Sequence, residues 1–192
     1  TGQYVGGLIG DNIGDVSYCH TSGSTRGNGH VGGLLGYSCD TVSKCNATGT
    51  TISTDYGLGG LVGFNVGTII NCFASGTTMG NSGIGGLVGM NSKTITNCFS
   101  TGTTSGTGEN IGGLVGSNSD TVTDCYTNCT TSGTSNIGGV VGLNNFNSII
   151  KNCYATGATS GSGDYIGGLV GRRYEGTITC SFWDKDTTGQ VS

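Results

Sequence analysis

Residues 85–104 read Gly-Gly-Leu-Val-Gly-Met-Asn-Ser-Lys-Thr-Ile-Thr-Asn-Cys-Phe-Ser-Thr-Gly-Thr-Thr and contain the two markers that decide the fold. The first marker is a Gly-Gly-aliphatic-aliphatic-Gly block, whose first glycine recurs at Gly6, Gly32, Gly59, Gly85, Gly112, Gly138 and Gly167. The second marker is a cysteine, which recurs at Cys19, Cys45, Cys72, Cys98, Cys125, Cys153 and Cys180. The glycine steps are 26 to 29 residues and the cysteine steps 26 to 28, so two independent markers give one period.

A unit of this length is too short to bury a core alone, so neighbouring units must stack. Its strand-like pieces, such as Thr94–Asn97 and Cys98–Thr104, are rich in β-branched residues and bounded by glycine and asparagine. The sequence therefore predicts an all-β fold, a right-handed parallel β-solenoid of about seven coils of 26–29 residues. We expect a single domain over residues 1–192, with a C-terminal cap at about 181–192, and a rod roughly 33 Å long at about 4.8 Å per coil.

The composition excludes several classes of protein. The chain has 41 Gly, no Pro and only 9% charged residues, which fits no ordinary globular enzyme. A formal net charge of -4 leaves no basic patch, so we expect no nucleic-acid partner. Apolar runs such as Ile111–Val115 are far too short to cross a bilayer, and we expect no membrane insertion.

The chain resembles the GLUG repeats of bacterial surface and adhesin-like proteins. The resemblance rests on residues 86–89 (Gly-Leu-Val-Gly), 94–98 (Thr-Ile-Thr-Asn-Cys) and 153–157 (Cys-Tyr-Ala-Thr-Gly), and on 181–184 (Ser-Phe-Trp-Asp), which is similar to the usual end of an array. It implies a β-solenoid on a secreted or cell-surface protein, and the sequence leaves open whether the chain is part of a larger surface protein. It implies no reaction, since a fold alone does not fix one.

Side chains in the strand after each ladder cysteine should alternate between core and solvent. If the cysteine points inward, three columns of small residues follow it inside: Thr21, Ala47, Ala74, Ser100, Thr127, Ala155; Gly23, Gly49, Gly76, Gly102, Cys129, Gly157; and Thr25, Thr51, Thr78, Thr104, Thr131, Thr159. The first outward column is His20, Asn46, Phe73, Phe99, Tyr126 and Tyr154. The opposite parity would bury His20 and Asn46, which are poor core residues. The residue before each ladder cysteine, for example Asn71 or Asn97, suits a bend with an asparagine ladder.

The two other outward columns suggest the leading functional interpretation, an ice-binding protein whose partner is the ice crystal surface. They consist of Ser22, Ser24, Thr48, Thr50, Ser75, Thr77, Thr101, Thr103, Asn128, Thr130 and Thr156. Such a grid, with spacings of about 6.7 Å along a strand and about 4.8 Å between strands, is similar in pattern to β-solenoid antifreeze proteins. The GLUG pattern often has Asn-Val where this chain has Thr50-Thr51 and its equivalents, so the excess of threonine on this face is a departure from the family pattern. A second grid, at Thr41 and Ser43, Thr94 and Thr96, and Thr121 and Thr123, is ordinary for the family and is interrupted by Ile70.

The alternative interpretation is a surface adhesin module that binds glycan or protein. It would use the outward aromatic residues Phe73, Phe99, Tyr126 and Tyr154, because a row of aromatic side chains often marks a contact surface. The same row would also arise from simple packing between neighbouring coils.

An enzyme is the third interpretation, and we expect no catalytic residues. Asp40 and Asp120 share a column but lie about 14 Å apart at the stacking distance of β-strands, beyond the roughly 5 to 9.5 Å of glycosidase carboxylate pairs. Two histidines and no Cys-x-x-Cys pair predict no metal site, and Asp184 and Asp186 lack the further oxygen ligands that calcium requires. We expect no cofactor.

The ladder cysteines should be mostly buried thiols. Parallel side chains in register suit the disulfide torsion badly, even in an extracellular chain where disulfides persist. Nine cysteines leave at least one free, and Cys39 and Cys129, off the ladder, are the expected members of any special pair.

Overall fold

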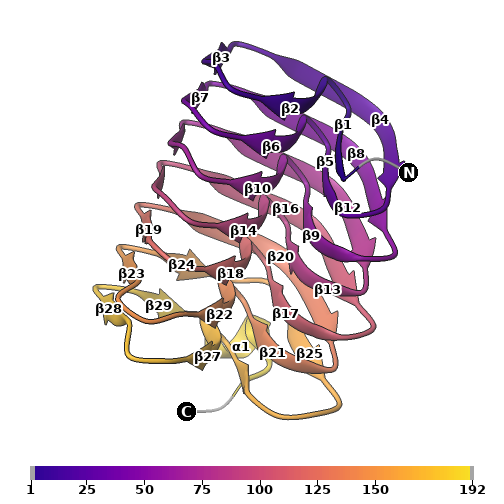
Figure 1. The fold of residues 1–192 in the computed structure, drawn as a ribbon. Helices are drawn as coiled ribbons and strands as arrows, with labels where there is room; N and C mark the ends of the chain where they lie inside the picture. Colours follow the sequence, from indigo (N-terminus) through magenta and orange to yellow (C-terminus); the bar gives the residue numbers. More distant parts are fainter. Residues whose placement is uncertain (1–2, 191–192) are drawn as a thin grey trace.

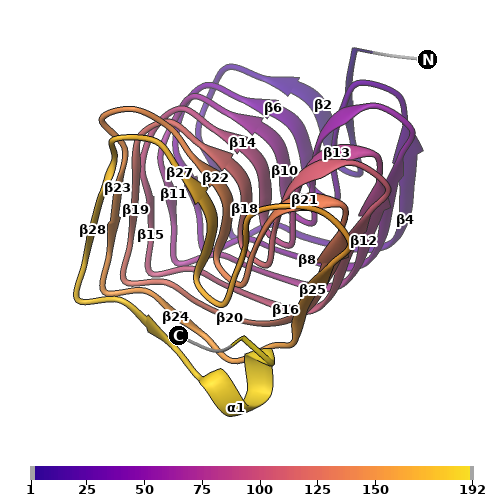
Figure 2. The ribbon, with the colours of Figure 1, turned by 90° about the horizontal axis from the view of Figure 1, so that it is seen from below.

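The computed structural model describes residues 3–190 and shows a parallel β-solenoid of about seven coils (Figure 1). Each coil contributes one strand to each of four sheets, which we name A to D in chain order. Viewed from its C-terminal end, the chain turns anticlockwise as it approaches the viewer, so the solenoid is right-handed (Figure 2). The predicted fold class is confirmed.

The strands of the four sheets recur in the same order in every coil. Sheet A contains β1 (Tyr4–Gly6), β5 (His30–Gly32), β9 (Tyr56–Gly59), β13 (Ser82–Gly85), β17 (Glu109–Gly112), β21 (Ser135–Gly138) and β26 (Ile166–Gly167). Sheet B contains β2 (Ile9–Asn12), β6 (Leu35–Ser38), β10 (Val62–Asn65), β14 (Val88–Asn91), β18 (Val115–Asn118), β22 (Val141–Asn144) and β27 (Val170–Arg173).

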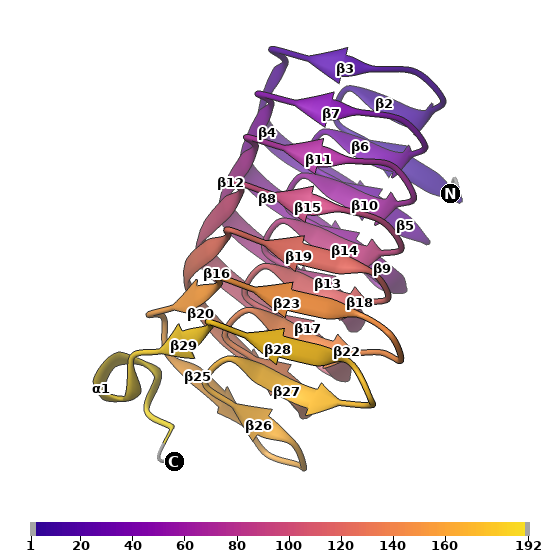
Figure 3. The ribbon, with the colours of Figure 1, turned by 90° about the vertical axis from the view of Figure 1, so that its left-hand side faces the viewer.

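Sheet C has short strands, and sheet D has the longest strands of the molecule (Figure 3). Sheet C contains β3 (Val16–Ser17), β7 (Val42–Ser43), β11 (Ile69–Ile70), β15 (Ile95–Thr96), β19 (Thr121–Thr123), β23 (Ile149–Lys151) and β28 (Thr177–Thr179). Sheet D contains β4 (His20–Gly27), β8 (Asn46–Ser53), β12 (Phe73–Gly80), β16 (Phe99–Gly106), β20 (Tyr126–Gly133), β24 (Tyr154–Ala155) and β29 (Phe182–Trp183), with β25 (Thr159–Gly161) also paired to β20.

The Gly-Gly turn between sheets A and B divides the interior into two cores, because it points inward toward sheet D (Figure 2). A Cβ added to the second glycine would lie 3.1 Å from the Ala47 methyl at Gly33 and 3.0 Å from the Ala74 methyl at Gly60. The smaller core contains Val31, Leu58, Ile84, Ile111 and Ile137 of sheet A. The larger core contains the ladder cysteines, the Leu and Val residues that follow each Gly-Gly turn, and the apolar residues of sheet C.

A buried asparagine ladder stabilises the end of sheet B. Asn65, Asn91, Asn118 and Asn144 are each 0–1% exposed. The Nδ2 of each of the first three donates to the Oδ1 of the next at 2.8, 2.8 and 2.9 Å. Each amide therefore bonds to one in a neighbouring coil, as buried polar groups require, and the ladder ends at Asn144, whose Nδ2 has no partner. The sequence analysis missed this ladder, although an asparagine two residues after the last glycine of the block was its signal.

The bend before each ladder cysteine is where the sequence predicts it. Asn71, Asn97 and Asn152 have left-handed backbone angles, with φ of 52–56°. Cys180 was assigned wrongly, because it occupies this bend with φ 49° and is exposed. Ser181 takes the ladder position instead, and its Oγ accepts a hydrogen bond from the Cys153 N–H at 3.0 Å. Tyr18, Lys44 and Asp124 occupy the same bend in other coils with φ of 53–55°, so the conformation is fixed by the fold and not by asparagine alone.

The C-terminal segment covers part of the last coil. Trp183 lies against Gly168, where an added Cβ would overlap the indole ring. A short helix, α1 (Lys185–Thr188), follows and buries Thr188 to 1% exposure. The Gln190 side chain donates to the Thr159 carbonyl at 2.7 Å. Residues 191–192 of the predicted cap lie outside the described residues. In the described part of the chain, no helix has the length and apolar character needed to span a membrane.

We expect deletion of residues 181–192 to lower Tm by about 2–4 °C or more and to promote association between molecules. Trp183 is 36% exposed, so its partial burial contributes about 1 kcal/mol, less than the about 1.5–3 kcal/mol of a fully buried side chain, and each kcal/mol shifts Tm by about 2–4 °C at this size. The deletion also exposes the strand edge of β24. Calorimetry and size-exclusion chromatography test this; an unchanged Tm with a clean monomer would contradict a capping role.

Candidate binding face

The outward surface of β4, β8, β12, β16 and β20, which we call the sheet D face, contains most of the predicted binding residues. Each of these strands has eight residues, and neighbouring strands pair in parallel with identical positions aligned, as in Thr77 with Thr103. Arg26 is the only Lys, Arg, Asp or Glu in the five strands. The sheet D face is therefore broad, regular and almost uncharged.

Exposure along these strands follows the predicted alternation. Thr51, Thr78, Thr104, Thr131 and Thr159 are 0–4% exposed and point inward. The preceding residue in four of these coils, at Thr50, Thr77, Thr103 and Thr130, is partly or fully exposed. The opposite parity, which would have buried the aromatic residues, does not occur.

The structure brings all the predicted ice-face residues onto the sheet D face except Thr156. Ser22 and Ser24 lie on β4, Thr48 and Thr50 on β8, Ser75 and Thr77 on β12, Thr101 and Thr103 on β16, and Asn128 and Thr130 on β20. Thr156 lies between β24 and β25, and its hydroxyl donates to the Thr127 carbonyl at 3.4 Å. The grid thus covers the first five coils and ends where sheet D is interrupted.

The glycine column differs from its prediction as an inward column. Gly23, Gly49, Gly76 and Gly102 are exposed and have φ of 103–134°, a backbone region that side chains rarely adopt. In the fifth coil Cys129 occupies the same column with its side chain buried to 2% exposure. Glycine is needed here because a Cβ at Gly49 or Gly76 would overlap the carbonyl oxygen of the glycine one coil earlier.

An aromatic row forms the edge of the sheet D face beside the bend. The rings of Phe73 and Phe99 stack at 4.9 Å and 5°, and those of Phe99 and Tyr126 at 5.0 Å and 7°. Tyr126 ends this stack and is 47% exposed. Tyr154 instead pairs with Phe182, with ring centroids 4.7 Å apart. Mutual stacking covers part of each ring, and the row presents an apolar ridge beside the hydroxyl columns.

A second aromatic cluster, which the sequence analysis missed, lies between sheets A and B in the first three coils. Tyr4 stacks on His30 at 5.6 Å, and Phe64 lies 5.2 Å from His30 and 5.7 Å from Tyr37. Burial lowers the pKa of His30, and its Nδ1 has no hydrogen-bond partner. These residues come from strands of two sheets, so no single column of the repeat shows them.

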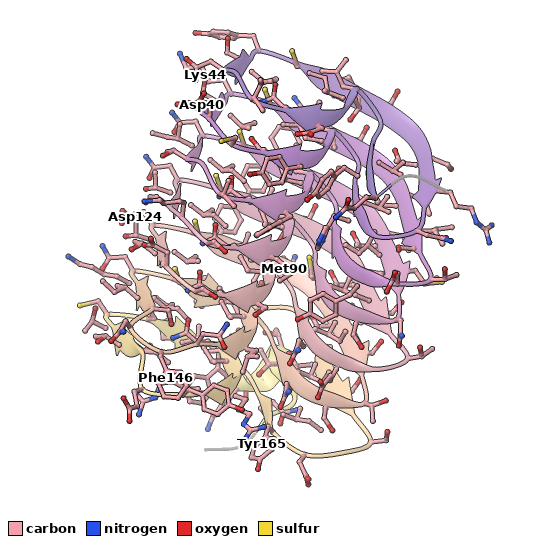
Figure 4. The ribbon with its side chains drawn as sticks, viewed as in Figure 1. Asp40, Lys44, Met90, Asp124, Phe146 and Tyr165 are labelled. Atoms are coloured by element: carbon pink, nitrogen blue, oxygen red, sulfur yellow. The ribbon has the colours of Figure 1, made fainter. Side chains whose placement is uncertain are left out.

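Apart from Arg26, the charged residues lie outside strands β4, β8, β12, β16 and β20. Asp40, Lys44 and Asp124 lie along one edge of the molecule (Figure 4). Hydrogen bonds from the side chains of Asn152 and Thr123 lower the pKa of Asp124. Residues 3–190 contain no group of three or more His, Cys, Asp or Glu side chains that could hold a metal ion.

The cysteine ladder is a column of thiols in the larger core. All nine cysteines are free, and Cys45, Cys72, Cys98, Cys125, Cys129 and Cys153 are buried. The N–H of Cys45 donates to the Cys72 Sγ at 3.4 Å, and that of Cys72 to the Cys98 Sγ at the same distance. The expectation of buried thiols is confirmed. Cys39 and Cys129, the expected members of any special pair, are both free, Cys39 at the surface and Cys129 inside.

We expect a maleimide reagent at neutral pH to label Cys39 and Cys180 rapidly and the six buried thiols only after unfolding. Burial raises the pKa of the Cys45 and Cys129 thiols, so they stay neutral and unreactive as well as shielded. Peptide mapping by mass spectrometry measures the rates. Fast labelling of Cys98 in the native protein would contradict the packing of the ladder.

The repeat is related to known sequences. Two segments, residues 54–78 and 133–160, match the GLUG motif. The predicted resemblance is confirmed. Each match spans about one coil, from the end of one sheet D strand into the next. The predicted likeness to antifreeze proteins stays a prediction.

Two larger proteins are similar to parts of this chain. Over 60 residues, 29% of the chain, it is 43% identical to a protein of Evansella cellulosilytica named "Putative Gly-rich membrane protein", of which it spans 7%. A crystal structure of "a putative immunoglobulin A1 protease from Bacteroides ovatus" covers 90% of the chain with a TM-score of 0.65 and 21% identity. The chain spans 59% of that structure. At this identity the likeness concerns the fold.

Proposed function

We propose that this chain is an adhesive module of an extracellular surface protein and that the sheet D face binds a neutral polysaccharide. The GLUG motifs, and the names of the two similar proteins, support a role at the cell surface. The observation that carries the ligand class is the sheet D face itself, where hydroxyl columns run beside an aromatic ridge on a surface with one formal charge, Arg26.

The chemistry of the sheet D face suits a polymer of neutral sugars. The hydroxyls of Thr101 and Thr103 can donate to and accept from sugar hydroxyls, and each neighbouring strand offers an equivalent pair about 4.8 Å away. Tyr126, at the end of the ring stack, has the exposed area to pack against a sugar ring. A β-branched side chain has few rotamers, so little entropy is lost on contact. With Arg26 as its one charged side chain, the sheet D face has too little positive charge to favour an acidic polymer.

We propose a non-catalytic role for the module. His20 is hydrogen-bonded through Nδ1 to Asn46, and His30 is packed among aromatic rings. Neither arrangement presents a histidine to a serine or cysteine nucleophile, which an acyl-transfer site requires.

Ice binding is the second candidate, and the in-register columns of Ser, Thr and Asn on five strands favour it. Five equally spaced pairs of short polar side chains form a surface on which water can be ordered. The aromatic ridge beside them does not belong to a flat lattice-matching surface, so we place polysaccharide first.

One set of variants tests both candidates. Pull-down on insoluble neutral glycans and a glycan array should show binding that Tyr126→Ala weakens at least fivefold. Tyr165→Ala is the matched control, because Tyr165 is also exposed but lies near the last coil between β25 and β26 (Figure 4). Thermal hysteresis is measured on the same proteins. Hysteresis without glycan binding would replace the first candidate with the second, and loss of neither property in Tyr126→Ala would remove the aromatic ridge from the site.

A further inference from the structure

An arginine in contact with two tyrosine rings lies on the last coil, outside sheets A and B and apart from the sheet D face. The guanidinium carbon of Arg172 lies 4.6 Å from the ring centroid of Tyr165 and 4.7 Å from that of Tyr174. Tyr174 in turn stacks on Phe146 of the coil before, at 5.2 Å and 7°. We call these four residues the Arg172 cluster, and Phe146 and Tyr165 lie at its two ends (Figure 4).

The backbone of the cluster is fixed by pairing with the coil before. Arg172 lies on β27, which pairs in parallel with β22. The Tyr174 N–H donates to the Asn144 carbonyl at 2.9 Å, and the Tyr165 carbonyl accepts from the Ile137 N–H at 3.0 Å. The side chains therefore start from regular structure, which gives a binding site more precision than a loop does.

The last coil departs from the repeat to form the cluster. Tyr165 occupies the left-handed bend that Asn110 and Asn136 occupy in earlier coils. Asn136 donates to the Asn110 Oδ1 at 2.7 Å, but its own Oδ1 is buried and has no partner. Arg173 likewise follows Asn144 in the other asparagine ladder, and the Asn144 Nδ2 has no partner. Asparagine at either position would continue a ladder, and a buried polar group without a partner costs stability. Packing between coils therefore does not account for the tyrosine and the arginines of this coil.

The guanidinium group has free donors. In residues 3–190, no protein group accepts a hydrogen bond from the Arg172 side chain. Asp164 and Glu175, the acidic residues next to the two tyrosines, are exposed and form no ion pair with it in the same part of the chain. Arginine has five N–H donors in a fixed plane. The two rings hold the guanidinium in place through cation–π contacts, so an acceptor that binds it costs little side-chain entropy.

A carboxylate on a sugar ring fits both parts of the cluster. A carboxylate accepts two parallel N–H bonds from one guanidinium. Phe146 is 55% exposed and Tyr165 is 53% exposed, so each has free ring surface against which a sugar ring can pack. Arg173 is exposed next to Arg172 in the sequence and adds a second positive charge to a chain whose formal net charge is -4.

We propose that the Arg172 cluster binds an acidic polysaccharide through the carboxylate of a hexuronic acid residue, with the sugar ring against an exposed aromatic ring. This site is separate from the sheet D face and differs from it in the charge of its ligand. An acidic protein segment fits less well, because a standard protein interface uses about 20–30 residues a side. The cluster has four residues, and the loop before Tyr165 exposes glycine and serine at 160–163.

Trigalacturonate and its methyl ester test the proposal, because they share the sugar ring and differ in the carboxylate. Isothermal titration calorimetry should show at least tenfold tighter binding of the acid than of the ester. Arg172→Gln should weaken binding of the acid at least tenfold, and Arg172→Lys at least fivefold, because lysine keeps the charge but lacks the planar pair of donors. Lys93→Gln is the matched control, because it removes an exposed positive charge from another coil and should change binding less than twofold.

The side-chain Nε–H resonance of Arg172 gives a second measurement on the unmodified protein. It should shift on addition of trigalacturonate and not of the ester. Equal binding of acid and ester, full binding by Arg172→Gln, or an equal loss in Lys93→Gln would overturn the proposal. Tighter binding of polyglutamate than of polygalacturonate would replace the polysaccharide with an acidic protein segment. A neutral sugar offers this site no carboxylate, so Tyr165→Ala remains a control for neutral glycans at the sheet D face.

Discussion

Gly112→Ala is expected to prevent the chain from folding. Gly112 ends β17 and begins the Gly-Gly turn, where an added Cβ would overlap the Val115 carbonyl oxygen and lie 2.8 Å from the Gly142 nitrogen. Both atoms are backbone, so no side-chain rotation relieves the contact. Hydrogen bonds to the neighbouring coils fix the turn on both sides: the Gly113 N–H donates to the Gly138 carbonyl, and the Gly112 carbonyl accepts from the Gly86 N–H. The loss of stability should exceed about 4 kcal/mol, at the extreme of single substitutions.

Gly14→Ala is the matched control. A Cβ at Gly14 meets nothing within 4 Å, and its φ is not positive. Its stability should change by no more than about 0.5 kcal/mol. Far-UV circular dichroism and urea unfolding compare the two variants. A cooperative native transition for Gly112→Ala near that of the parent would show that the turn can open, and that the glycine pattern does not determine the fold.

The repeat could be predicted from the sequence because every coil has the same steric requirement for glycine and cysteine at fixed positions. Glycine is obligatory where the turn between sheets A and B meets backbone on all sides, and the ladder cysteine fills one position of the larger core. Two such markers in phase fix the length of the coil and the parallel stacking. The alternation in sheet D was also readable, since Thr103 and Thr104 belong to a strand whose side chains must alternate.

Features that depend on how a coil bends could not be predicted from the sequence. The inward Gly-Gly turn splits the interior into two cores, and it is this turn that requires a small residue at Ala74. In the sequence alone, the asparagines of the buried ladder, such as Asn118, resemble polar residues exposed to solvent. Cys180 lies within one residue of the position that the period predicts. Only the backbone conformation shows that Ser181, and not Cys180, occupies the ladder position that Cys153 has in the coil before.

The surface that forms the candidate site could be predicted from the sequence, but the ligand that it binds could not. Period two assigns Thr101 and Phe99 to the outside of sheet D, and the structure places them there. The same columns would satisfy strand propensity and packing between coils, so the pattern is compatible with sugar, ice or solvent. The cluster of Tyr4, Tyr37 and Phe64 joins two sheets, which a column-by-column analysis does not combine.

We expect Thr103→Tyr to abolish binding at the sheet D face with little change in stability, and Thr131→Tyr to destabilise the fold. Thr103 is exposed at the centre of its column, so added bulk extends into solvent and should cost no more than about 0.5 kcal/mol. Thr131 is 0% exposed and its hydroxyl donates to the Cys129 carbonyl at 3.4 Å. A ring there overpacks the interior by about 1–3 kcal/mol or more.

Binding to neutral glycan, thermal hysteresis and melting temperature are measured on both variants. A flat or extended ligand cannot pass around a protruding ring, so Thr103→Tyr separates the neighbouring Thr77 and Thr130 from it, whichever ligand the face binds. Since Thr131→Tyr alters the interior, its binding should fall only in proportion to the unfolded fraction. Full binding by Thr103→Tyr would remove the sheet D face as the site, and a larger loss of stability for Thr103→Tyr than for Thr131→Tyr would reverse the parity of the strand.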